Sequence, residues 1–133
     1  MKKNGVLNVK LSTVIARMGH TDRLVICDVG LPIPREADVI DLALAANVPP
    51  FFDTLQVILG ELHVQNCIIA EEMKTKNDDL YEKVSRLMRG VPIQSCPHAQ
   101  FKEMTKNGNV IAFVRTGEAS PFANIILESG VTF

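Results

Sequence analysis

The sequence lacks a marked excess of either charge: 14 lysines and arginines face 15 aspartates and glutamates, for a formal net charge of -1. No basic stripe stands out, which argues against nucleic acid as a partner. No apolar run approaches the length of a membrane span. Asn8, Lys10 and Ser12 interrupt the start of the chain, unlike the apolar segment of a signal peptide. We therefore expect a cytoplasmic protein without a membrane partner.

Cysteine is also scarce. Cys27, Cys67 and Cys96 are widely separated and form no CxxC pair, so they lack the clustering of a zinc site. Cys27 and Cys67 lie inside apolar runs, which predicts small buried hydrophobic side chains. Low-complexity segments, internal repeats and linkers are absent too. The 133 residues are therefore expected to form one domain, 1–133, that is long enough to bury a core.

The spacing of apolar residues predicts helices that alternate with strands. Leu11, Val14, Ile15 and Met18 share one face of a helix over 8–18, which Gly19 is expected to end in a left-handed conformation. The same reasoning predicts further helices over 49–62, 77–88 (capped by residue 77 or 78) and 97–104 (stopped at 107–108), and strands over 24–27, 40–44, 64–70, 91–96, 110–114 and 124–127.

This alternation predicts an α/β fold: a three-layer α/β/α sandwich with helices on both faces of a mainly parallel, mixed sheet. The connection from Val114 to Asn124 contains no predicted helix, which allows those two strands to be antiparallel.

Polar residues follow several of the predicted strands. Ligands collect beyond the carboxyl ends of strands in open α/β sheets. Asp28 ends the first apolar strand, His98 follows the strand over 91–96, and the loop 115–118 follows another. Asp28 either takes part in a site or hydrogen-bonds its own turn. The pair Glu71–Glu72 is typical of a solvated helix start rather than of paired catalytic carboxylates.

His20 comes directly after the predicted end of the first helix. A histidine there can simply bind the last carbonyl groups of the helix. A helix C-terminus also stabilises imidazolium, by about 0.3–1 kcal/mol, which favours a protonated donor near neutral pH. His63 lacks such a setting and is expected on the surface.

Taken together, the ordered segments resemble the D-ribose pyranase family, over essentially the whole chain. The segments that carry this resemblance are 7–8, 19–22, 28–34, 40–43, 70–74, 97–98, 101–102, 115–118, 120–127 and 130–133. The related fucose mutarotases share the Gly-His pair, the strand-end Asp and the Thr-Gly-Glu features. The turn at 30–34 and the segment 40–43 are similar to the ribose branch.

The resemblance implies a cofactor-independent isomerase of carbohydrate metabolism that interconverts β-D-ribopyranose and β-D-ribofuranose in ribose catabolism. It places the proton donor at His20 and implies a ring-shaped homo-oligomer, a homodecamer, with sites near subunit boundaries. The family usually has tyrosine at the position of Phe122, which removes one hydroxyl from the expected site. The implied monosaccharide-binding residues are Asp28, His98, Lys102, Phe122, Ala123 and Asn124.

The implied reaction needs only proton transfers, since opening a cyclic hemiacetal moves one proton from the anomeric hydroxyl and supplies one to the ring oxygen. General acid–base groups suffice, and histidine is suited to this role near neutral pH. Asp28 either orients His20 or binds a sugar hydroxyl, and the sequence leaves both open. No cofactor and no metal are expected.

Three alternatives remain at this stage. His20, Asp28 and His98 have the composition of a non-haem iron triad, although any chain with three histidines offers such a set by chance. A fucose-type mutarotase would use the same residue types. A non-catalytic sugar-binding or transport-accessory module would use the same pocket without needing His20.

Overall fold

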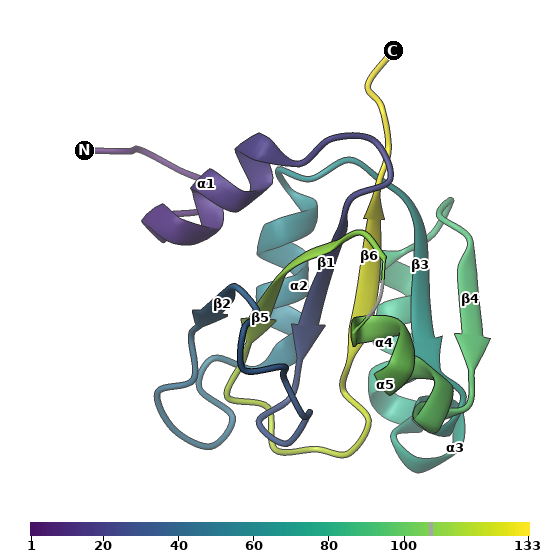
Figure 1. Ribbon diagram of the computed structural model, residues 1–133. Helices are drawn as coiled ribbons and strands as arrows, with labels where there is room; N and C mark the ends of the chain where they lie inside the picture. Colours follow the sequence, from purple (N-terminus) through teal and green to yellow (C-terminus); the bar gives the residue numbers. More distant parts are fainter. Residues whose placement is uncertain (107) are drawn as a thin grey trace.

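The computed structural model describes residues 1–106 and 108–133 of the chain, as a six-stranded sheet covered by helices (Figure 1). In chain order the elements are α1 (Val9–Arg17), β1 (Arg23–Cys27), β2 (Val39–Asp41), α2 (Phe51–Leu59), β3 (Val64–Ala70), α3 (Glu72–Lys76), α4 (Asp78–Leu87), β4 (Ile93–Cys96), α5 (His98–Lys106), β5 (Val110–Arg115) and β6 (Ile125–Ser129).

The strand order in the sheet is β2-β5-β1-β6-β3-β4. β1 pairs in parallel with β5, β2 with β5, and β3 with β4. β6 runs antiparallel between β1 and β3. The predicted mixed, mainly parallel sheet is confirmed. β5 and β6 run in opposite directions, as the short connection allowed, but they are not neighbours because β1 lies between them.

A hydrophobic core lies on each face of the sheet, between the sheet and the elements that cover it. Leu24 and Ile26 of β1 face one core, which also receives buried side chains of α1, α2 and α4. Val25 and Cys27 of the same strand face the other core, where Phe101 of α5 packs. β1 is therefore apolar at successive positions because both of its faces are buried. In Figure 1, α5 lies in front of the sheet and α2 and α4 lie behind it.

Several local predictions needed correction. Gly19 does not adopt the left-handed conformation expected of it; Thr21 does, with φ 68°. The side chain of Asn77 makes no cap bond on α4 and instead donates to Ser120 Oγ and Pro121 O, both at 2.8 Å. The strand predicted over 40–44 is limited to Val39–Asp41. The predicted helix stop at 107–108 falls partly on residue 107, outside the described residues.

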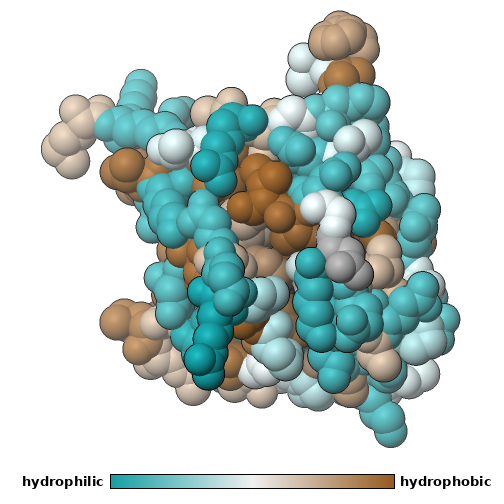
Figure 2. All heavy atoms as spheres, viewed as in Figure 1, coloured by the Kyte–Doolittle hydropathy of each residue, from teal (hydrophilic) through white to brown (hydrophobic). Residues whose placement is uncertain are grey.

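The three cysteines are free and buried, as predicted for Cys27 and Cys67. Burial raises the pKa of each of these two thiols to about 12. Within 1–106 and 108–133, no helix combines the length and the apolar character needed to cross a membrane. Figure 2 shows a mostly polar face in this orientation, with an apolar tip at the top where the C-terminal tail projects; Val131 and Phe133 of that tail are exposed.

Candidate functional site

The strand directions bring distant segments to one edge of the sheet. β1 and β4 end at this edge, so Asp28 and His98 follow them there. β6 runs the opposite way and therefore begins at the same edge, which adds the segment 122–124 that precedes it. Together they form a pocket of about 210 Å³, small enough for a compact ligand. Its lining residues are Asp28, Gly30, Leu31, His98, Pro121, Phe122 and Asn124.

Asp28 and Asn124 hold each other through two hydrogen bonds. The backbone N–H of Asp28 donates to Asn124 Oδ1 at 3.0 Å, and Asn124 Nδ2 donates to Asp28 Oδ2 at 2.9 Å. Asp28 Oδ1 also accepts from the backbone N–H groups of Gly30 and Leu31, both at 2.9 Å. Asp28 therefore makes the turn contacts that the sequence left open, and it also lines the pocket.

His98 begins α5 directly after β4 and Pro97. Its backbone N–H donates to both carboxylate oxygens of Glu72, at 2.9 and 3.1 Å. Its ring meets the ring of Phe122 edge-on, with centroids 5.0 Å apart. Among the described residues, Nδ1 of His98 is buried without a hydrogen-bond partner. Buried polar atoms are normally paired, so a partner from a ligand or water would satisfy this one.

Glu72 is a residue whose role the sequence did not predict. The pair Glu71–Glu72 was expected to be a solvated helix start, and Glu72 does begin α3. Its carboxylate nevertheless reaches the N-terminus of α5, where it accepts the bonds from His98. A carboxylate is favoured at a helix N-terminus by the helix dipole. The residues Glu71 and Glu72 alone do not predict this contact, because α5 begins 26 residues after Glu72.

Phe122 has a left-handed backbone, with φ 58°. This conformation is unfavourable for a bulky residue and tends to persist at functional sites where surrounding contacts hold it. The Phe122 carbonyl accepts from the N–H of Asn124 at 2.9 Å, which closes a tight turn. Ala123 is fully buried and does not line the pocket with its side chain. Phe122 both lines the pocket and packs against the larger core.

Lys102 lies one helical turn after His98 on α5, so the two side chains share a helix face. Lys102 is half-buried and does not line the pocket formed by this chain alone.

The loop 115–118 is mainly a scaffold beside the pocket. Arg115 pairs with Asp41 at 3.2 Å, and Thr116 Oγ1 donates to Cys27 O at 2.8 Å. Glu118 Oε2 accepts from the N–H of Phe51 at 2.9 Å at the start of α2. The polar side chains of this loop therefore have structural partners, and their presence needs no role in ligand binding.

His20 lies at the opposite edge of the sheet. It precedes β1, whereas Asp28 follows it, and the four residue steps within β1 alone span about 13 Å. His20 Nε2 lies 3.1 Å from Gln65 Oε1. The structure therefore does not bring His20 to Asp28 within one chain, and of the two roles that the sequence left open for Asp28, orienting the His20 of its own chain does not fit this geometry. The triad of His20, Asp28 and His98 is not assembled within one chain either.

The backbone beside His20 is held in an unusual conformation. Thr21 is left-handed although it is β-branched. Its N–H donates to Ser129 O at 2.9 Å, and Asn109 Nδ2 donates to the Thr21 carbonyl at 3.2 Å. These contacts place the exposed His20 side chain over the start of β3. His63 is exposed, as predicted.

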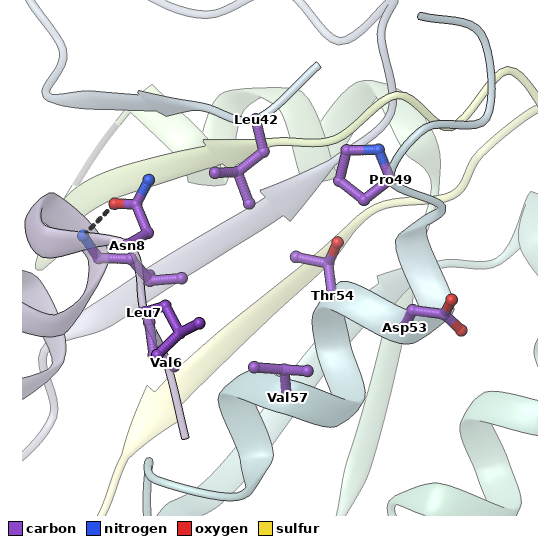
Figure 3. Close-up of a pocket in the computed structure, with 9 residues that line it drawn as sticks. Val6, Leu7, Asn8, Leu42, Pro49, Asp53, Thr54 and Val57 are labelled. Carbon is purple, nitrogen blue, oxygen red and sulfur yellow. Dashed lines mark hydrogen bonds between the residues drawn. The ribbon is translucent and has the colours of Figure 1, made fainter. Parts of the chain in front are cut away.

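A separate hollow of about 220 Å³ lies between the N-terminal segment and α2 (Figure 3). Val6, Leu42 and Val57 make it largely apolar, and Asn8 points its Oδ1 to the N–H of Leu11 at 2.9 Å. None of the residues predicted to bind a ligand lines it. Four of the residues predicted to bind the sugar line the pocket at the carboxyl edge of the sheet instead, namely Asp28, His98, Phe122 and Asn124.

The sequence is similar to known proteins over its whole length. A family model described as the RbsD / FucU transport protein family matches residues 1–132. A D-ribose pyranase of Geobacillus thermodenitrificans is 53% identical over all of this chain and 99% of that protein. A D-ribose pyranase of Coprothermobacter proteolyticus is 50% identical over the full length of both.

Solved structures show the same similarity. Bacillus subtilis RbsD, solved in complex with D-ribose, has a TM-score of 0.95 and 41% identity, with both chains fully covered. The fucose mutarotase of Streptococcus pneumoniae, solved with L-fucose, has a TM-score of 0.79 at 23% identity, covering 96% of this chain and 95% of that one. The latter similarity supports the fold alone.

Proposed function

This chain belongs to the RbsD / FucU transport protein family, and on that premise we propose that it is an enzyme that interconverts the pyranose and furanose forms of D-ribose. One observation carries the proposal: the whole chain matches Bacillus subtilis RbsD, a protein solved with D-ribose, at a TM-score of 0.95. The full-length relatives named D-ribose pyranase point to the same activity. The fucose mutarotase is far less similar, which favours ribose over fucose.

The pocket at the carboxyl edge is proposed to bind the sugar. Asp28 and Asn124 offer a carboxylate and an amide beside the cavity. The buried Nδ1 of His98, which has no partner within the described part of the chain, offers a further hydrogen-bonding atom. The ring of Phe122 would pack against the C–H groups of the sugar. Ala123 would contribute through its backbone, since its side chain is buried.

Lys102 would reach sugar bound above the pocket from the same helix face as His98. His20 is proposed as the general acid that protonates the ring oxygen.

Because His20 and the pocket lie at opposite edges of one sheet, we propose that they meet between two copies of the chain. The His20 edge also carries the end of β6 and the exposed tail with Val131 and Phe133. Exposed apolar side chains beside a functional histidine favour docking of this edge on another subunit. Repeated in one direction, such a contact closes into a ring. A ring-shaped homodecamer is the assembly we propose.

The cytoplasm is the proposed place of action. All three cysteines are buried free thiols, as is usual in a reducing compartment. Cell fractionation with an antibody to the chain would check this, and recovery in an extracytoplasmic fraction would contradict it.

NMR exchange spectroscopy of D-ribose at equilibrium tests the activity. We expect the protein to accelerate exchange between pyranose and furanose signals, more strongly than for L-fucose. His20→Ala should abolish the acceleration while the circular dichroism spectrum stays unchanged, because His20 is exposed. Unaccelerated exchange with a folded wild-type protein would show a binding module rather than an enzyme.

Complementation tests whether the site is shared. His20→Ala and Asp28→Asn subunits should each be inactive alone. Mixed oligomers from co-expression should regain part of the activity, because some interfaces then combine an intact His20 with an intact pocket. Mixed oligomers as inactive as the single variants would contradict a site built from two copies.

A further inference from the structure

Consecutive hydrogen bonds connect the side chain of His20 to Gln65, Glu128 and Arg23. Arg23 Nε and Nη2 donate to Glu128 Oε2 at 2.9 and 2.7 Å. Gln65 Nε2 donates to Glu128 Oε1 at 3.0 Å. Gln65 Oε1 in turn lies 3.1 Å from His20 Nε2. These side chains come from three neighbouring strands: Arg23 from β1, Glu128 from β6 and Gln65 from β3. Paired strands of one sheet therefore hold the hydrogen-bonded side chains in place.

The backbone of β3 is irregular at Gln65. Val64 pairs with Ser129 and Asn66 with Glu128, and the register shifts between them, so Gln65 has no paired residue of its own on β6. Such bulges redirect a side chain and often lie next to functional sites. Gly130 leaves room for this arrangement, because a Cβ there would come within 3.0 Å of the Gln65 Cβ. The irregularity places the Gln65 amide between Glu128 and His20.

The direction of each hydrogen bond follows from the chemistry of its ends. An ionised carboxylate only accepts, so Glu128 requires the NH₂ group of Gln65 on its side. The carbonyl oxygen of Gln65 must then face His20. A carbonyl oxygen also only accepts, so the ring nitrogen opposite it has to donate. His20 Nε2 therefore carries the hydrogen.

We propose that Gln65 is a positioning residue that holds His20 with Nε2 as a fixed donor and leaves Nδ1 as the atom that exchanges protons with the sugar. The inference rests on the proposed function of His20. In the ring-opening step, Nδ1–H of the imidazolium gives its proton to the ring oxygen as the bond from that oxygen to the anomeric carbon breaks. Both bonding electrons stay on the ring oxygen. The anomeric hydroxyl gives its proton to water, forming hydronium, and becomes the carbonyl; the hydronium then returns a proton to Nδ1.

The tautomer of His20 can be measured without any activity assay. Long-range ¹H–¹⁵N correlation spectra of ¹⁵N-labelled protein distinguish a protonated from an unprotonated ring nitrogen, and the signals missing in His20→Ala identify His20. Neutral His20 in the wild-type protein is expected to carry its hydrogen on Nε2. A hydrogen found mainly on Nδ1 would overturn the inference even if His20→Ala is inactive.

Gln65→Leu removes the amide and keeps a similar volume. We expect a mixture of both His20 tautomers and ring exchange slowed about 10- to 100-fold, because misplacement of a catalytic group has costs of this order. Gln56→Leu, the same change at an exposed site on α2, should alter neither measurement. Unchanged tautomer and rate in folded Gln65→Leu would refute the role of Gln65. Full activity of His20→Ala would instead refute the proposed role of His20 as the general acid. The tautomer measured in the wild-type protein would still show whether Gln65 accepts a hydrogen bond from His20 Nε2.

Discussion

Asp28 and Asn124 form a closed pair in which each residue both donates and accepts a hydrogen bond. The N–H of Asp28 donates to the Asn124 side chain, and the Asn124 amide donates back to the Asp28 carboxylate. Asn124 is almost fully buried, with 1% of its surface exposed. The pair joins the end of β1 to the start of β6, and it forms one wall of the pocket.

Exchanging the two side chains tests this pair. Asn124→Asp alone puts two carboxylates against each other and should lower the free energy of unfolding by about 1–3 kcal/mol, with loss of ribose binding. Adding Asp28→Asn restores a donor opposite an acceptor, while the introduced amide oxygen can still accept from Gly30 and Leu31. The double variant should recover most of the stability in urea denaturation. Strictly additive losses would show that the two residues do not interact.

Phe122 is expected to serve both binding and stability. Phe122→Ala should weaken D-ribose binding and lower Tm together, because the ring lines the pocket and packs on the core. Phe122→Tyr should tighten binding by at most about tenfold, the worth of one net hydrogen bond. Calorimetric titration and thermal unfolding measure both effects.

Phe52→Ala is the control for Phe122→Ala. Phe52 is half-buried on α2 beside Lys83, and it does not line the pocket at the carboxyl edge, so only Tm should fall. Unchanged ribose affinity in Phe122→Ala would reject the proposed packing against the sugar.

Gly117 is expected to tolerate no side chain. A Cβ there would collide with the backbone oxygens of Ala45 and Val48, which cannot rotate away as a side chain would. Gly117→Ala should therefore destabilise the protein by about 1–3 kcal/mol in urea denaturation. Gly19→Ala is the matched control, since its nearest neighbour would be Asp22 Oδ2 at 3.7 Å. Equal stability of the two variants would contradict the close packing of Gly117 against the backbone of Ala45 and Val48.

The carboxylate of Glu128 should make stability depend on pH in the acid range. Burial tends to raise the pKa of Glu128, but hydrogen bonds from Arg23 and Gln65 and the positive charge of Arg23 outweigh burial and lower it. The ionised form then favours the folded state above the unfolded-state pKa of about 4.3. This contribution is lost as the pH falls through 4.3 towards the lower folded-state pKa.

Glu128→Gln should accordingly be less stable than the wild type at pH 7, by about 1–3 kcal/mol, and this difference should shrink below pH 4.3. Urea denaturation at pH 7, 5 and 3 provides the measurement. Glu82→Gln removes an exposed carboxylate 3.9 Å from Arg86 and should change stability little at any of these pH values. A stability difference for Glu128→Gln that is constant with pH would show that its charge is not involved.

The sequence by itself predicted the layered α/β fold and the edge of the sheet at which two candidate site residues lie. Apolar runs such as 24–27 predict strands buried on both faces, and the alternation with helices predicts the parallel sheet. In such a sheet, residues that follow strands share one edge, so the sequence places Asp28 and His98 at the same edge. The resemblance to ribose pyranases added the segment 122–124, which local pattern could not place.

Tertiary structure decided what depends on strand pairing between distant segments. β6 inserts antiparallel between β1 and β3, and only this direction brings Phe122 and Asn124 to Asp28 while sending Glu128 to the far edge beside Gln65. His20 is eight positions before Asp28 in the sequence, yet an extended strand separates them because it rises about 3.3 Å per residue. Nearness along the chain therefore does not bring His20 to Asp28, and the contacts of Glu72 and Gln65 join segments that are distant in the sequence.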